Sequence, residues 1–176
     1  MNNWDKYFLD ICKTISTNSK CLSRQIGAII VKDKSIIATG YNGPPRGVDP
    51  CSMRYINDQK LIELLKDQVG YGTKLTYENV KDQCPRRILD FRSGKGLEWC
   101  VAGHAERNCI VNAARHGVSV NGSTLYCNCP IPCSPCLIEI INAGVLEVVV
   151  TSLDCYDEMG KWLVEQSKLK VRKFDF

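Results

Sequence analysis

Residues 26–40 read IGAIIVKDKSIIATG, two short runs rich in β-branched side chains with a polar Lys-Asp-Lys between them. Such runs favour strands, and a short polar turn that joins two of them is typical of a β-hairpin. We therefore expect two neighbouring strands, over residues 26–31 and 35–40. This hairpin would start the sheet around which the remaining elements are arranged.

Helices and strands alternate on both sides of the hairpin. Apolar side chains recur at helical spacing in residues 4–16, which predicts an amphipathic helix that covers a sheet. Further helices are expected over residues 105–115, 135–143 and 161–168, and further strands over 123–127, 146–151 and 171–174. This alternation is typical of an α/β fold with a layered sheet, and we expect residues 1–176 to form a single domain.

Residues 43–100 interrupt the alternation. Prolines and glycines break this segment repeatedly, and within it only residues 57–69 show a helical pattern. A loop of this length is uncommon in a compact domain unless it is functional or held together by an added contact. We expect a long insertion after the second strand, stabilised by something other than a large core.

The composition excludes several classes of protein. The chain has 176 residues, of which 44% are hydrophobic, enough to bury a core. Its net charge of +4 comes from 23 basic and 19 acidic residues without the basic stripe of a dedicated nucleic-acid binder. No apolar run approaches the roughly 20 residues needed to cross a bilayer, and we see no signal peptide. We expect an intracellular protein of small anionic ligands, with no nucleic acid and no membrane as partner.

The chain contains 11 cysteines. An odd number and an intracellular setting argue against a disulfide framework, so metal binding explains some of these thiols better. Four others lie among apolar neighbours in the sequence and are expected to be buried packing residues: Cys12, Cys109, Cys127 and Cys155.

Two short motifs carry the chemistry, Gly103-His104-Ala105-Glu106 and Pro132-Cys133-Ser134-Pro135-Cys136. Cys133 and Cys136 are three residues apart, so at the start of a helix their sulfurs share one face. A helix N-terminus also stabilises thiolates. With His104 they make three zinc ligands, and a zinc with three protein ligands keeps a position for water.

Glu106 is the candidate proton carrier. Side chains at i and i+2 point about 200° apart on a regular helix, so His104 must cap the helix if both are to reach one site. Zinc lowers the pKa of a bound water to about 7, and a carboxylate beside it can move the proton. The alternative is a core histidine, a solvated acid and a structural or redox cysteine pair. The combination H-x-E with P-C-x-x-C is the signature of zinc deaminases and favours a hydrolytic site.

With these motifs, with Gly40-Tyr41-Asn42-Gly43 and with residues 21–28, the chain resembles the zinc-dependent cytidine deaminase superfamily, most closely its phage and bacterial deoxycytidylate (dCMP) deaminases. The resemblance covers nearly the whole chain. It implies a three-layer α/β/α cytidine-deaminase-like fold with a five-stranded mixed sheet. It also implies a homo-hexameric hydrolase, cytoplasmic or in the host cytoplasm if viral. This enzyme would convert dCMP to dUMP and ammonia for thymidylate synthesis, activated by dCTP and inhibited by dTTP.

The resemblance further implies roles for single residues. Glu106 would protonate N3 of the cytosine, Asn42 would bind the sugar, and the backbone at Ala105 would read the base. The 5′-phosphate would contact Arg24 and Tyr156, and the effector would contact Arg46, Arg54 and Arg115. From the residues alone, Asn42 also fits a turn before a glycine, and the arginines fit a solvated surface or a helix end.

A second zinc is implied in the insertion. Cys21 and Cys51 stand where the family can carry a non-catalytic zinc, and Cys84 and Cys100 complete a set of four thiols. A closed tetrahedral site would order a long, broken loop. Relatives use a histidine or a carboxylate in this set, so four thiolates are a departure from the family. The alternative is four unrelated core thiols.

Three other functions stay open. The nearest is the same chemistry on dCTP or on a modified dCMP, because the pocket lining rather than the metal sets that choice. A deaminase of bases within RNA or DNA would need a basic track with stacking aromatics, which these residues do not show. The third is a zinc-stabilised binding module without catalysis.

Overall fold

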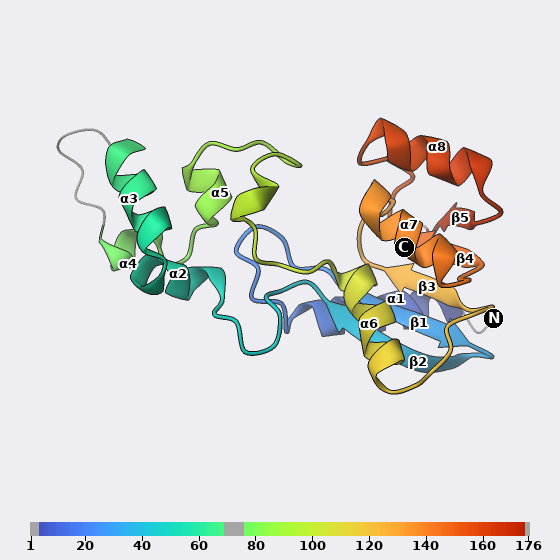
Figure 1. Cartoon of the computed structure of the whole chain (residues 1–176). Coiled ribbons are helices and arrows are strands. Elements are labelled where there is room, and N and C mark those ends of the chain that lie inside the picture. The colour runs from blue at the N-terminus through green and yellow to red at the C-terminus, as the bar shows by residue number, and fades with distance from the viewer. Residues whose placement is uncertain (1–3, 69–75, 175–176) are drawn as a thin grey trace. The chain divides into compact units, whose positions relative to one another are not determined.

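The computed structural model describes residues 4–68 and 76–174 (Figure 1). By its contacts the chain divides into two units. The described residues of the first unit are 4–19, 26–42 and 104–174, and those of the second are 20–25, 43–68 and 76–103. The prediction that the whole chain forms one domain stays a prediction.

The first unit is built on the expected hairpin. Strands β1 (Gly27–Lys32) and β2 (Ser35–Tyr41) are antiparallel. They are joined through Asp33 and Lys34, whose φ angles of 49° and 59° are left-handed. Two left-handed residues match the twist of a tight hairpin. The turn is therefore one residue shorter than the expected Lys-Asp-Lys, because Lys32 still pairs in β1.

The sheet has five strands in the order β2-β1-β3-β4-β5. The added strands are β3 (Thr124–Cys127), β4 (Glu147–Val150) and β5 (Lys170–Lys173). β3 is antiparallel to β1, whereas the β3–β4 and β4–β5 pairs are parallel. The predicted five-stranded mixed sheet is confirmed.

Helices cover both faces of this sheet (Figure 1). Alternate strand residues point to opposite faces, so Ile29 and Val31 pack under α1 (Trp4–Ser16), whereas Ala28 and Ile30 face the other side. That side is covered by α6 (Ala105–Arg115), α7 (Ser134–Asn142) and α8 (Glu158–Gln166). The three-layer α/β/α arrangement is confirmed. α8 begins at Glu158, before the predicted residue 161.

Gly40 lets α6 approach β2 closely. A Cβ added at Gly40 would lie 2.4 Å from the carbonyl oxygen of Ala105 and 2.6 Å from the backbone nitrogen of Cys109. Both atoms belong to the helix backbone, so no side-chain rotation can relieve the clash. The first turn of α6, which carries Glu106, therefore depends on a glycine in the strand.

Gly40→Ala is expected to destabilise the protein by about 3 kcal/mol, because α6 must move away from the sheet. Urea unfolding monitored by circular dichroism measures the change. Thr39→Ala, at an exposed neighbouring position of β2, is the control and should cost about 1 kcal/mol or less. Equal midpoints for Gly40→Ala and the unchanged protein would contradict this close approach.

An ion-pair network ties α1 to the far edge of the sheet. Arg172 of β5 donates to both carboxylate oxygens of Asp5, at 2.7 and 2.8 Å, and to Glu147 at 3.0 Å. The hydrogen bond from Arg172 lowers the pKa of Asp5. Burial alone would raise the pKa of Glu147, but hydrogen bonds from Arg172 and Lys170 hold it below its usual value. Both carboxylates are thus stabilised in their charged form.

Arg172→Met is expected to lower the free energy of unfolding by about 2 kcal/mol at neutral pH. Because both carboxylate pKa values are depressed in the folded chain, this stabilisation is complete above pH about 4.5 and is lost as the pH falls further. Melting temperatures of both proteins between pH 7 and pH 3 should therefore converge at the acid end. Lys170→Met, which removes a more exposed partner of Glu147, should have the smaller effect. A gap that stays constant with pH would contradict the network.

The second unit has more helix than the sequence predicted. Its helices are α2 (Cys51–Asn57), α3 (Gln59–Gln68), α4 (Tyr77–Val80) and α5 (Pro85–Ile88), with a 3₁₀ turn at Leu97–Trp99. They enclose a small core of Tyr55, Leu61, Leu65, Val80 and Leu89. The helix predicted over residues 57–69 is present as α3, which starts at Gln59. The expectation that it would be the one helix of the insertion is wrong, because the added helices of one or two turns are too short to show a period. Residue 69 lies outside the described residues.

None of the helices within the described ranges is both long and apolar enough to cross a membrane.

One of the four presumed packing thiols is at the surface. Cys12, Cys109 and Cys127 are buried, as predicted, but Cys155 is exposed. Its apolar neighbours Leu153 and Tyr156 are exposed as well, since this segment leads from β4 to α8 over the surface. Apolar neighbours in sequence therefore did not indicate burial there.

Candidate metal centre

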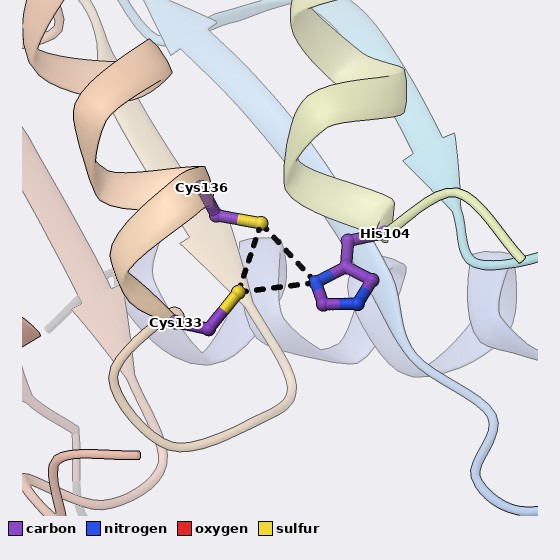
Figure 2. A group of neighbouring side chains, drawn as sticks. All are labelled: His104, Cys133 and Cys136. Carbon is purple, nitrogen blue, oxygen red and sulfur yellow. Dashed lines mark hydrogen bonds between the residues drawn. The ribbon is translucent and has the colours of Figure 1, made fainter. Parts of the chain in front are cut away.

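His104, Cys133 and Cys136 come together at the starts of two helices (Figure 2). His104 precedes α6 and Cys133 precedes α7, both with extended backbone angles, and Cys136 lies in the first turn of α7. The Nδ1 atom of His104 is 3.2 Å from the sulfur of Cys136 and 3.3 Å from that of Cys133. The two sulfurs are 3.6 Å apart. The three predicted ligands thus face a single point.

This donor set fits zinc. With metal–ligand distances of about 2.0–2.3 Å, a tetrahedral zinc places its ligand atoms about 3.5–3.8 Å apart. The separations found here are within a few tenths of an ångström of that range. One imidazole and two thiolates are also ligands that zinc prefers, and they balance its double charge. They leave one of the four positions to a non-protein ligand.

Electrostatics at the site favour a bound cation. The hydrogen bond between the two thiols lowers the pKa of Cys133 to about 4, and the contact with His104 adds to this effect. The hydrogen bond with Cys133, together with burial, raises the pKa of Cys136. Cysteine binds metals as the thiolate, so a lowered pKa at Cys133 suits a metal ligand.

Glu106 lies in the first turn of α6 and is almost fully buried, with 4% of its surface exposed. Burial raises the pKa of its carboxyl group, and the neighbouring His104 acts in the opposite direction. Because His104 is the capping residue and not part of the helix, the 200° separation of positions i and i+2 does not apply. A carboxyl group that holds a proton more readily than usual suits a proton carrier.

Three further residues contact Glu106 or the helix starts, and the sequence analysis gave none of them a role in the site: it named Cys127 as a packing thiol and did not single out Cys129 or Asp157. The sulfur of Cys129 is 3.9 Å from Oε1 of Glu106 and 3.2 Å from the sulfur of Cys127. Asp157 accepts hydrogen bonds from the backbone nitrogens of Ser134, at 3.1 Å, and of Gly160, at 2.6 Å, and so connects the starts of α7 and α8. The spacing of Cys127 and Cys129 is a usable signal, because residues i and i+2 of an extended segment face the same side.

Asn42 follows β2 and is buried, with 7% of its surface exposed. Its Oδ1 accepts hydrogen bonds from the hydroxyl of Ser19 at 2.7 Å and from the backbone nitrogen of Ile26 at 2.8 Å. These two donors identify the oxygen end of the amide and hold the side chain in one orientation. Ala105, the first residue of α6, is fully buried.

The remaining candidate contacts lie on different parts of the chain. Arg24 is exposed and donates to the hydroxyl of Ser93 at 3.2 Å, and Tyr156 is 44% exposed. Arg46 and Arg115 are exposed. Arg54 is engaged within its unit, because it pairs with Asp58 at 2.7 Å and donates to the carbonyl oxygen of Trp99. That engagement counts against an effector role for Arg54.

The four cysteines of the proposed second site all belong to the second unit. Cys51 and Cys84 are buried, and Cys21 and Cys100 are half-buried. Burial raises the pKa of Cys51 to about 11, and the nearby thiols of Cys84, Cys100 and Cys21 also act to raise it. Within the described residues, two other groups have ligand atoms within 4.8 Å of one another, and these four thiols do not form a third.

Comparison with known proteins identifies relatives of the chain. Residues 2–152 match the family model of the cytidine and deoxycytidylate deaminase zinc-binding region. The deoxycytidylate deaminase of Enterobacteria phage T2 is 35% identical over 146 residues, which cover 80% of this chain and 76% of that protein. That of Mycobacterium phage D29 is 31% identical over 152 residues, 84% of this chain and 93% of that protein.

Longer relatives match almost the entire chain. The deoxycytidylate deaminase of Saccharomyces cerevisiae is 29% identical over 174 residues, which are 99% of this chain and 46% of that protein. The chain thus spans less than half the length of this relative. Among solved structures, the dCMP deaminase of cyanophage S-TIM5 superposes with a TM-score of 0.64 at 24% identity and covers 99% of both chains. It has also been solved with dCMP and dUMP. At this identity the likeness shows the fold, which is that of the cytidine deaminases.

Proposed function

The chain belongs to the cytidine and deoxycytidylate deaminase family, and from that membership we propose that it hydrolyses dCMP to dUMP and ammonia with a bound zinc. The observation that carries the proposal is the convergence of His104, Cys133 and Cys136 beside the buried carboxyl group of Glu106. Metal ligands alone are also found in structural sites. A buried acid near them adds a group that could carry the protons of a hydrolysis.

The residues divide the reaction between them. His104, Cys133 and Cys136 would hold the zinc, which supplies a Lewis acid that lowers the pKa of water to about 7. The carboxylate of Glu106 would take a proton from the attacking water and deliver it to N3 of the cytosine. It would then pass the second proton to the amino group that leaves C4 as ammonia. Burial of Glu106 keeps competing solvent protons away.

Substrate contacts are proposed for four residues. Asn42 would bind the sugar, since its amide is already oriented by Ser19 and Ile26. The backbone at Ala105 would read the base. Arg24, whose planar guanidinium matches phosphate oxygens, and Tyr156 would contact the 5′-phosphate. Two further properties remain predictions. One is activation by dCTP and inhibition by dTTP, with Arg46, Arg54 and Arg115 as contacts. The other is a homo-hexamer located in the cytoplasm, or in the host cytoplasm if the chain is viral.

A second, structural zinc is proposed in the insertion, held by Cys21, Cys51, Cys84 and Cys100. Support comes from the burial of Cys51 and Cys84. The thiols of Cys21, Cys84 and Cys100 are also close enough to Cys51 to raise its pKa. The thiols would have to move together to bind one ion. The small core of this unit means that the zinc would add to its stability and would not be its sole support.

The test is ammonia release by purified protein from dCMP, dCTP, a modified dCMP and cytidine within RNA or DNA, with zinc per chain measured in parallel. We expect the highest kcat/KM with dCMP, raised by added dCTP, and two zinc ions per chain when free zinc is scarce. A higher kcat/KM for dCTP would replace the proposed substrate. No release from any of these compounds would favour a binding module that uses zinc only for stability.

A further inference from the structure

A second group of metal-binding side chains lies beside the proposed proton carrier. Glu106, Cys127 and Cys129 are all buried, and their candidate ligand atoms lie within 4.8 Å of one another. Cys127 is the last residue of β3, and Cys129 follows two residues later. Both belong to the core on the sheet face that α6 covers, the helix that carries Glu106. The end of β3, the residues just after it and α6 therefore bring three candidate ligands together.

The geometry of this group resembles that of the first site. The two sulfurs are 3.2 Å apart, and the sulfur of Cys129 is 3.9 Å from Oε1 of Glu106. Ligand atoms around a tetrahedral zinc are about 3.5–3.8 Å apart, so small side-chain shifts would suffice. Two thiolates also select thiophilic cations over magnesium or calcium.

Cys127 and Cys129 have different polar neighbours from another buried cysteine of the same core. Cys109, also fully buried on α6, donates to the carbonyl oxygen of Ala28 at 3.0 Å, and it belongs to neither set of clustered ligands in the described part of the chain. A thiol of that kind behaves as a small apolar side chain. Cys127 and Cys129 differ because each faces the other and Cys129 faces a carboxyl group.

We propose that Glu106, Cys127 and Cys129 form an inhibitory site for a thiophilic cation such as zinc in excess. The inhibitory effect rests on the proposed function, because a carboxylate that coordinates a cation cannot also carry protons. Two thiolates and a carboxylate leave a net charge of −1 around a divalent ion, whereas His104, Cys133 and Cys136 balance it. A buried net charge is costly, so the second site fills only at higher free zinc.

The experiment measures bound zinc per chain by equilibrium dialysis over a graded range of free zinc. It compares the unchanged protein, Cys129→Ala, Glu106→Gln and the control Cys109→Ala, which removes a buried thiol outside the cluster. All four proteins should bind the same amount of zinc per chain when free zinc is scarce. In excess zinc, the unchanged protein and Cys109→Ala should bind one ion more than Cys129→Ala and Glu106→Gln. Zinc on surface groups is common to all four and cancels.

Deaminase activity is followed over the same zinc range. In the unchanged protein and in Cys109→Ala, activity should fall as free zinc rises. The free zinc concentration at which half of the activity is lost should equal the one at which the extra ion is half bound. Equal zinc contents in all four proteins would overturn the site. An extra ion bound without loss of activity would overturn its inhibitory role. Glu106→Gln keeps the shape of the side chain, so the binding comparison stands even if Cys129→Ala folds poorly. If the unchanged protein deaminates no nucleotide, the proposed function fails, while the zinc contents still decide whether the site exists.

Discussion

Glu106→Gln is expected to lower kcat for dCMP by about 10³–10⁴-fold, while the chain keeps its fold and the zinc at His104, Cys133 and Cys136. The amide has nearly the same size as the carboxyl group, so the packing at this buried position changes little. It cannot accept a proton from water and pass it to the base, and general acid–base catalysis contributes about 10²–10⁴-fold. Loss of the buried charge-bearing group affects the transition state more than binding, so KM should change far less than kcat.

Steady-state kinetics, zinc content at scarce free zinc and circular dichroism measure the three parts of this prediction. Glu139→Gln is the matched control, because Glu139 is an accessible glutamate of α7 that pairs with Arg107 at 2.7 Å. A surface ion pair of this kind contributes little, so kcat should stay within about twofold. Unchanged turnover in Glu106→Gln would refute the role of this residue as proton carrier.

Removal of zinc is expected to abolish deamination altogether, and readdition of stoichiometric zinc should restore it. Without the cation, water keeps a pKa near 16, and the nucleophile is lost. Cys136→Ser should reproduce the loss permanently, because Cys136 is fully buried and a hydroxyl is a poor zinc ligand. We expect at least about a 10³-fold fall in kcat/KM in both cases.

Chelation followed by desalting, zinc analysis and ammonia release test this expectation. Cys155→Ser serves as the control, because Cys155 is an exposed thiol outside the clustered ligand sets of the described residues. It should bind zinc and turn over as the unchanged protein does. Full activity in a chain shown to be free of metal would remove the basis for a zinc deaminase.

Periodic patterns were enough to predict the first unit. Runs such as residues 26–31 alternate between two buried faces, and the 4–16 stripe is helical, so strand and helix could be assigned from neighbouring residues alone. The five-stranded mixed sheet came from the family resemblance and not from periodicity. The insertion was assigned less well, since α2, α4 and α5 have 7, 4 and 4 residues, too few for a repeat to appear.

The sequence by itself determined the chemical identity of the candidate metal site. The residue types at His104, Cys133 and Cys136, and the acid at Glu106, are readable from spacing because each motif lies within one helical turn. The tertiary structure decided which thiols meet. Cys129 comes to lie against Glu106, a contact that its spacing from Cys127 does not reveal, and Cys155 lies at the surface although its neighbours in the sequence are apolar. The contact between Cys129 and Glu106 joins residues that are not neighbours in the chain, and it depends on how α6 packs against the sheet.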